Sequence, residues 1–224
     1  MLNNFIQIFE YNYIYFLLLI TFIVGCIPFG LIISNLAGYG DIRKIGSGNI
    51  GATNVLRTGN KMLAFLTLIL DIFKSFMMLL IMKCIYSSVL SQELLTNLYS
   101  LTALLSVLGH MYSPFIKFKG GKGIATSAGI LLFISYPVAI LTALIWILIA
   151  IASKKSSLGA LTSSISSIIF LWSIQQMVNA NILNNYFYLS DIELYLFVII
   201  VIFIWIKHIP NILRLLNKSE SNIN

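Results

Sequence analysis

Residues 124–152 read IATSAGILLFISYPVAILTALIWILIAIA, a run that contains no charged side chain. A helix that crosses the roughly 30 Å hydrocarbon core of a bilayer needs about 20 apolar residues. One straight helix over the whole run would be about 43 Å long, which is too long for that core without strong tilt. Tyr136 and Pro137 stand near its middle. The run therefore indicates a membrane protein, and the way it folds decides how many times the chain crosses.

The rest of the chain has the same character. Of its 224 residues 59% are hydrophobic and only 9% are charged, whereas soluble domains carry about 25% charged residues. Backbone amides in lipid must be bonded internally, so each apolar run is predicted to be helical. The other runs are 13–37, 62–86, 94–111, 158–178 and 194–206. We predict an all-α integral membrane protein with a single domain over residues 1–224, in which the polar residues 217–224 form a frayed tail.

The positions of the cations predict the orientation. All but two of the 14 Lys and Arg residues, Lys74 and Lys83, lie in four segments. The segments are 43–61, 117–122, 154–155 and 207–218. The remaining connections carry only acidic charges, and so do the residues before the first run, where the cations of a secretory signal are missing. Because positive loops stay inside, we predict an external N-terminus and a cytoplasmic C-terminus.

This orientation has a consequence for the long run. Segments 117–122 and 154–155 lie on the same side, so the chain between them must cross an even number of times. We therefore predict two shorter helices with a turn near Pro137, which gives seven transmembrane helices in all. Each would be short of a full span, and would be sheltered by protein or reach only part of the way. The alternative is one tilted helix with residues 154–155 outside.

The first cytoplasmic loop is predicted to bind an anion. Residues 46–57 read GSGNIGATNVLR and contain the pattern GxGxxG, but the loop follows a membrane helix and not a strand, which excludes a dinucleotide site. Glycines let backbone amides approach an anion closely, and Arg57 adds a forked cation suited to phosphate. Short polar donors surround them at Ser47, Asn49, Thr53 and Asn54.

The second loop is predicted to form another anion site. Residues 117–126 read KFKGGKGIAT, in which Gly follows Lys122 where a Walker A loop needs Ser or Thr. Three glycines still join two lysines to the start of a helix, and such a start attracts anions. Residues 153–157 read SKKSS, which suits either a substrate contact or an ordinary topological anchor.

Two further sets of polar residues lie on or inside apolar runs. His208 and Asn211 are three apart, so they share a face if the tail is helical, while Pro210 suggests a kink or a new helix start. Asp71 and Lys74 are also three apart, within the second run. Charges inside a membrane are costly, and we favour a structural ion pair over a proton or ion path.

Three separated motifs together resemble the acyl-phosphate:glycerol-3-phosphate acyltransferases, often called the PlsY family. The motifs are residues 47–57, 110–126 and 207–220; they stand in the family's order between apolar runs of the right length. The resemblance implies seven membrane helices, an external N-terminus and an active site on the cytoplasmic face of a bacterial inner membrane. It implies transfer of an acyl group from acyl phosphate to the sn-1 hydroxyl of glycerol 3-phosphate, in phospholipid synthesis.

The resemblance also implies roles for matching residues. Ser47 and Arg57 would hold phosphoryl oxygens, and His208 and Asn211 would sit at the reacting centre. Glu220 would be structural. Substrate-binding positions would be Gly48, Asn49, Gly51, Thr53 and Asn54 around the donor head, and Lys119, Gly120, Gly121, Lys122, Gly123 and Ser157 around the acceptor. Lys207 stands where the family usually has Arg, and Lys218 where it usually has Gly, so the tail departs from the pattern.

The expected chemistry needs few groups. An acyl phosphate is already activated, so the protein must align the hydroxyl and stabilise the developing charge. The base is either His208 or the substrate's own phosphate, and we favour the phosphate because no acidic residue in these motifs orients His208. We expect no cofactor or metal and no nucleic-acid partner; the expected partners are the two substrates, the bilayer and the enzyme that supplies acyl phosphate. The alternative function is a transporter or flippase for a phosphorylated solute.

Overall fold

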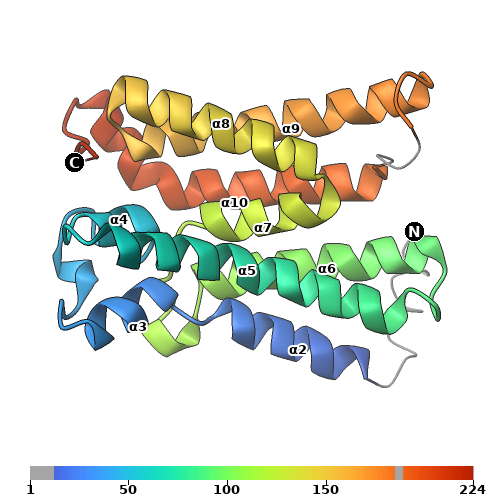
Figure 1. Ribbon diagram of the computed structural model, residues 1–224, viewed down its shortest axis with the longest axis horizontal. Coiled ribbons are helices and arrows are strands. Elements are labelled where there is room, and N and C mark those ends of the chain that lie inside the picture. Colours follow the sequence, from blue (N-terminus) through green and yellow to red (C-terminus); the bar gives the residue numbers. More distant parts are fainter. Residues whose placement is uncertain (1–12, 185–188, 224) are drawn as a thin grey trace.

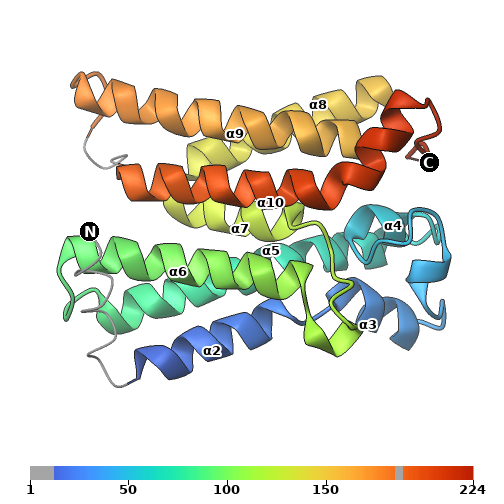
Figure 2. The same cartoon turned by 180° about the vertical axis from the view of Figure 1, so that it is seen from behind.

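The computed structural model describes residues 13–184 and 189–223, and every regular element in these ranges is helical (Figure 1). The elements are α2 (Ile14–Gly25), α3 (Phe29–Leu36), η1 (Ile42–Lys44), α4 (Ala52–Leu56), α5 (Lys61–Tyr86), α6 (Gln92–Met111), η2 (Pro114–Ile116), α7 (Ile124–Ile134), α8 (Tyr136–Ser153), α9 (Ser156–Asn179) and α10 (Asp191–Leu216). The long helices run along the longest axis of the molecule in both views (Figures 1 and 2). The predicted all-helical class is confirmed for the described residues, while the signal prediction concerns residues 1–12, outside them.

The outer faces of the long helices are apolar. Large hydrophobic side chains are exposed on several of them, among them Phe65 on α5, Leu148 on α8 and Trp172 on α9. Soluble monomers rarely expose so much apolar surface to water, whereas such a surface is stable in contact with lipid. Five described helices are long and apolar enough to cross a membrane, or six if the bent pair of α2 and α3 counts as one span.

The first apolar run is not one helix, contrary to the prediction. It breaks before Pro28, and α3 is bent by 49° from α2. Proline cannot continue the hydrogen-bond ladder, so the break frees carbonyl groups that lipid cannot satisfy. Distant side chains satisfy them: the Ser113 hydroxyl donates to the Cys26 carbonyl at 2.9 Å, and the Lys74 ammonium donates to the Ile27 carbonyl at 3.2 Å.

The long run forms two helices, as the charge pattern predicts. The chain leaves α7 at Ser135 and begins α8 at Tyr136, with Pro137 in the first turn of α8, where its missing N–H costs no hydrogen bond. The expected shortness is confirmed only for α7, which has 11 residues; α8 has 18 and is long enough to span. Gly129 lets α7 lie against α5, because a Cβ there would collide with the Ile72 carbonyl oxygen.

Helix α10 begins three residues before its apolar run and ends ten residues after it. A capping box begins it: the Ser190 hydroxyl accepts from the Glu193 backbone, and the Glu193 carboxylate accepts from Ser190. The helix then continues through Pro210 to Leu216, so Pro210 does not start a new helix. The last turns change direction in Figure 2, in keeping with a proline kink. His208 and Asn211 therefore lie on one continuous helix, both almost fully buried.

Candidate active site

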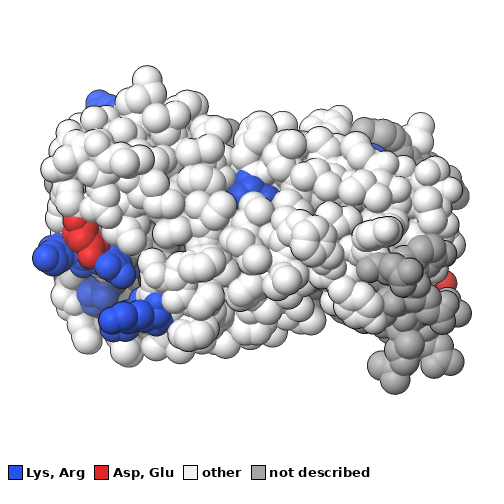
Figure 3. All heavy atoms as spheres, turned by 90° about the horizontal axis from the view of Figure 1, so that it is seen from below, with Lys and Arg blue, Asp and Glu red and all other residues white. Residues whose placement is uncertain are grey.

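The four cationic segments meet at one end of the bundle. Thr53 on α4 bonds Ser156 at the start of α9, with 3.1 Å between the hydroxyl oxygens. The Arg57 guanidinium donates to the Ser221 hydroxyl at 2.5 Å, and the Ile223 amide donates to the Lys154 carbonyl at 2.8 Å. Figure 3 shows Lys and Arg side chains gathered at this end of the visible face. Lys122 donates to Asn211, which donates to Glu220, and Lys155 donates to the carbonyl of Glu220. These bonds confirm the prediction that residues 117–122 and 154–155 share a side of the bundle.

Asn54 organises the first loop. Its amide nitrogen donates to the Ile42 and Asn49 carbonyls at 2.8 and 2.7 Å. Its amide oxygen accepts from the Ser47 backbone amide at 3.1 Å and from Arg57 Nη1 at 3.2 Å. Both amide hydrogens therefore have partners in this region of the protein, so the side chain fixes the position of Ser47 and Arg57, and the substrate contact expected of Asn54 stays a prediction.

Glu220 holds the tail in the site. One carboxylate oxygen accepts from the Ser157 hydroxyl and from Asn211 Nδ2, each at 2.7 Å, and the other accepts from Arg214 Nε at 2.7 Å. Burial raises the pKa of this carboxyl, but the bonds from Ser157, Asn211 and Arg214 outweigh that effect and lower it overall. Residues 217–223, for which the sequence predicts a frayed tail, run back across the first loop and the start of α9.

Lys122 lies between the second loop and α10. Its ammonium donates to the Asn211 amide oxygen, whose own amide nitrogen donates to Glu220. Burial and the nearby Arg214 and Arg57 lower the pKa of Lys122 to about 8, although Glu220 opposes them. Burial also lowers the pKa of Arg57. These cations outnumber the one carboxylate among them, so the site is prepared for an anion.

His208 has a defined tautomer. Its Nδ1 lies 2.8 Å from the carbonyl oxygen of Ile204, one turn earlier on α10. A carbonyl oxygen can only accept, so Nδ1 carries the proton and Nε2 offers a lone pair. The His208 ring is therefore oriented by the backbone carbonyl of Ile204 and not by an acidic side chain, which the sequence motifs lack.

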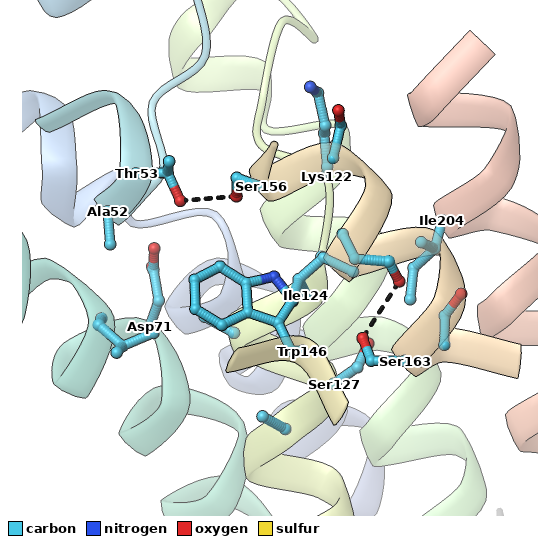
Figure 4. A pocket seen from close by; sticks show the side chains of 18 of the residues that line it. Ala52, Thr53, Asp71, Lys122, Ile124, Ser127, Trp146, Ser156, Ser163 and Ile204 are labelled. Atoms are coloured by element: carbon cyan, nitrogen blue, oxygen red, sulfur yellow. Dashed lines mark hydrogen bonds between the residues drawn. The ribbon is translucent and has the colours of Figure 1, made fainter. Parts of the chain in front are cut away.

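Two cavities meet at this end. The larger has a volume of about 440 Å³ and a mostly apolar wall from α5, α7, α8, α9 and α10. Figure 4 shows the Thr53–Ser156 hydrogen bond and the indole ring of Trp146 among its lining side chains. The smaller has a volume of about 190 Å³ and four cations in its wall: Lys119, Lys122, Lys207 and Arg214. Both cavities are lined by Ser47, Asn49, Lys122 and Asn211.

Nearly all the predicted site residues line one of these cavities. Those on the larger cavity are Ser47, Asn49, Gly51, Thr53, Asn54, Arg57, Lys122, Gly123, Ser157, His208 and Asn211, and the smaller adds Gly48, Lys119 and Gly120. Gly121 lines neither and packs against His110. Sequence reasoning missed Ser156, His110 and Arg214 as lining residues, and assigned Glu220 no place there. The position of Arg214 could not be predicted from the sequence, because it depends on the tail turning back so that Glu220 pairs with Arg214.

A membrane-embedded helix bundle, in which a cavity lined by cations adjoins an apolar cavity, suits a membrane protein that handles both a charged and a lipid substrate. The family described as glycerol-3-phosphate acyltransferase matches residues 15–218. A protein of that name from Bartonella quintana (strain Toulouse) is 41% identical, over 94% of this chain and 92% of the relative. One from Ehrlichia ruminantium (strain Gardel) is 38% identical, over 92% of this chain and 94% of the relative. The chain belongs to the glycerol-3-phosphate acyltransferase family.

Solved structures agree with this assignment. The crystal structure of PlsY (YgiH), an integral membrane glycerol 3-phosphate acyltransferase, in its glycerol 3-phosphate form, is similar with a TM-score of 0.80 and 34% identity, covering 94% of this chain and 96% of that one. Its lysophosphatidic acid form is similar with a TM-score of 0.75 and 34% identity, over 93% and 94% of the two chains. The resemblance expected from the three motifs is thus confirmed, and the chain is a multi-pass membrane protein.

Proposed function

We propose that this chain transfers an acyl group from acyl phosphate to the sn-1 hydroxyl of glycerol 3-phosphate, in phospholipid synthesis. The products are 1-acyl-glycerol 3-phosphate and phosphate, and the whole chain acts as one domain. The observation that carries the proposal is the pair of cavities with opposite chemistry that share Ser47, Asn49, Lys122 and Asn211. A reaction between a lipid and an anion needs two adjoining binding cavities, so that the reacting atoms can meet.

The larger cavity suits the acyl donor. Apolar side chains such as Trp146, Phe197 and Ile204 line it and can bury a hydrocarbon chain at about 0.8 kcal/mol per CH₂ group. Arg57 and Ser47 lie at its polar end, where we assign the phosphoryl group of the donor. The backbone of residues 48–54 would surround the same group, because its glycine-rich amides suit phosphate oxygens.

The smaller cavity suits the acceptor. Glycerol 3-phosphate carries close to two negative charges at neutral pH, and four cations line a space of about 190 Å³. Lys122 belongs to both cavities, so it can hold the acceptor beside the donor. The ammonium of Lys207, which also lines this cavity, lies 4.1 Å from the centre of the Tyr112 ring and supplies a charge without the fork of an Arg.

The reaction then needs alignment and a proton acceptor. The acceptor hydroxyl oxygen attacks the donor carbonyl carbon, the bond from that carbon to the phosphate oxygen breaks, and phosphate leaves. Nε2 of His208 accepts the hydrogen bond of the hydroxyl, since Ile204 holds the ring with that nitrogen unprotonated. The proton ends on the departing phosphate or on His208, and the variant His208→Gln separates these routes. Turnover near normal with an unchanged pH profile assigns the proton to phosphate, whereas a loss of about 100-fold or more, in the range of general-base catalysis, assigns it to His208.

The membrane arrangement is part of the proposal. With α2 and α3 counted as one bent span and the short α7, which reaches only part of the way, counted as a crossing, the chain crosses seven times. An odd number puts the N-terminus on the face opposite the site. Because the cations gather at the site end, we place that end in the cytoplasm, at a bacterial inner membrane. There it can meet a water-soluble acceptor and the enzyme that supplies acyl phosphate.

One assay tests the function. Purified protein in lipid nanodiscs receives long-chain acyl phosphate and glycerol 3-phosphate, and the release of free phosphate is followed. We expect release that depends on both substrates and is strongly reduced in Ser47→Ala and Arg57→Ala. Equal release from these variants would reject the proposal. Uptake of labelled glycerol 3-phosphate into proteoliposomes without phosphate release would support a transporter instead.

A further inference from the structure

A closed polar cluster lies next to the site and touches its second loop. Lys74 on α5 donates to Asp71 Oδ1 at 2.8 Å, to His110 Nδ1 at 2.8 Å and to the Ile27 carbonyl at 3.2 Å. An ammonium group has three hydrogens, and these three acceptors use them all. Because Lys74 donates to Nδ1 of His110, the proton of the neutral ring stands on Nε2. The cluster therefore fixes both the ring plane and the tautomer of His110.

The second loop is folded directly on His110. The Gly121 amide donates to the His110 carbonyl at 3.0 Å. A Cβ at Gly121 would collide with Nε2 of the His110 ring, and a Cβ at Gly120 would collide with the His110 carbonyl oxygen. Neither glycine has a positive φ, unlike Gly123 at the start of α7. These two glycines are therefore needed for close approach to His110 and not for an unusual backbone conformation.

Lys122 is the next residue along the chain and lines both cavities. It lies between Gly121, which rests on the ring, and Gly123, whose φ of 86° begins α7. A shift of the loop on His110 would move the ammonium of Lys122 relative to Asn211 and the acceptor cavity. His110 and Asp71 themselves line the larger cavity, and Figure 4 shows Asp71 beside it.

We propose that His110 is a positioning residue: held by Lys74 and Asp71, it sets the loop of residues 120–123 so that Lys122 meets the phosphate of the acceptor. The role rests on the proposed function, since it assigns glycerol 3-phosphate to Lys122. It gives the intramembrane ion pair a task beyond stability. Lys74 bonds the broken first span and His110, and His110 in turn contacts the loop that carries Lys122.

The first test is His110→Asn. Asparagine keeps an acceptor for Lys74 close to the position of Nδ1, but it removes the ring edge on which Gly121 rests. We expect the KM for glycerol 3-phosphate to rise at least fivefold, with less than a threefold change in kcat and in the KM for acyl phosphate. The matched control is Leu98→Ala, a fully buried position further back on α6. It should lower the unfolding temperature and leave both KM values unchanged.

The second test is compensation. Gly121→Ala places a methyl group against the ring, so it should raise the KM for glycerol 3-phosphate alone. In the double variant His110→Asn/Gly121→Ala the two closest ring atoms are gone. The rise in the KM for glycerol 3-phosphate should then be smaller than the product of the rises in the two single variants. Losses that multiply, or a KM unchanged in His110→Asn, would overturn the proposal.

Two readouts keep the proposal separate from folding and from the proposed function. Calorimetric binding of glycerol 3-phosphate needs no donor and should weaken at least fivefold in His110→Asn. If His110→Asn and His110→Gln both fail to accumulate as monodisperse protein, His110 is required for folding and the positioning role is rejected. If wild-type protein binds glycerol 3-phosphate but releases no phosphate, the proposed reaction fails while the binding comparison still decides the role of His110.

Discussion

Two polar clusters lie close together in this bundle, and they are built in opposite ways. In the closed cluster, Lys74 has one carboxylate, one ring nitrogen and one carbonyl for its three hydrogens, and the side chains of Lys74, Asp71 and His110 are almost fully buried. In the open cluster, Arg57, Lys122 and Arg214 share a single carboxylate, that of Glu220. Both border the larger cavity.

The difference separates a scaffold from a binding site. Burying a charge is costly unless it is paired, so a balanced cluster can persist without a ligand. A cluster with excess positive charge at the end of the bundle retains attraction for an anion. The predicted consequences differ too: loss of charge balance in the closed cluster should appear first in stability, and loss of a cation from the open cluster first in catalysis.

The largest expected effect comes from breaking the closed cluster. Asp71→Leu leaves a buried ammonium without its carboxylate, and we expect a loss of about 3–5 kcal/mol in the free energy of unfolding. The double variant Asp71→Leu/Lys74→Met removes both charges and should recover most of that loss. Unfolding in detergent micelles measures both. Equal destabilisation by the single and double variants would show that the charge pairing is not what matters.

In the open cluster, Arg57→Ala should act on catalysis. The side chain is only partly buried and donates to Asn54 in its own loop and to Ser221 in the C-terminal tail, so we expect only a small change in the unfolding temperature. Loss of charge-assisted bonds worth about 1.5–3 kcal/mol predicts a fall in kcat/KM of roughly 10- to 100-fold. Arg57→Lys keeps the positive charge but not the forked guanidinium, so its kcat/KM should lie between those of the wild type and Arg57→Ala. A large loss of stability in Arg57→Ala would contradict the division between the clusters.

Much of this arrangement follows from the sequence. The cation count predicts that residues 117–122 and 154–155 share one side, and the parity of crossings then predicts the turn between α7 and α8. A three-residue spacing puts His208 and Asn211 on one face. These predictions succeed because charge placement and helical period are local properties of the chain.

The remaining features depend on contacts between distant segments. The break before Pro28 is stable because Ser113 and Lys74 satisfy the freed carbonyls, and nothing near Pro28 in the sequence shows this. The polar composition of residues 217–224 suggests fraying, but Glu220 finds donors on α9 and α10. Asn54 looks like one more short donor until its partners within the loop are known.

A smaller effect is expected from Glu220→Gln. The substituted side chain loses least when its oxygen still accepts from Ser157 and Asn211, and its amide nitrogen then replaces the acceptor of Arg214, so that bond is lost and activity should fall about tenfold. Since the pKa of Glu220 is lowered in the folded protein, its contribution to stability is complete above pH 4.5 and is lost as the pH falls further. Unfolding temperatures measured from pH 7 down to about pH 3 should show this decline in the wild type. A decline of equal size in Glu220→Gln would mean that another group causes it.

The smallest effect concerns the charge of Lys122. Burial and its cationic neighbours lower its pKa to about 8, so half of the free enzyme carries a neutral lysine at that pH. The kcat/KM for glycerol 3-phosphate reports the free enzyme and should be reduced about twofold at pH 8, with a further decline above it. The phosphate of the acceptor titrates near pH 6 and does not contribute there.

Lys122→Arg supplies the control for this titration. Arginine stays charged throughout the range, so its profile should be flat between pH 7 and pH 9 even if the altered geometry lowers the overall rate. Bound phosphate favours the protonated lysine, so wild-type kcat at saturating glycerol 3-phosphate should decline at a higher pH than kcat/KM does. If the kcat/KM of the wild type and that of Lys122→Arg decline over the same pH range, the titrating group is not Lys122. The open cluster would then keep its positive charge at high pH, and the excess of cations over Glu220 would be larger than we infer.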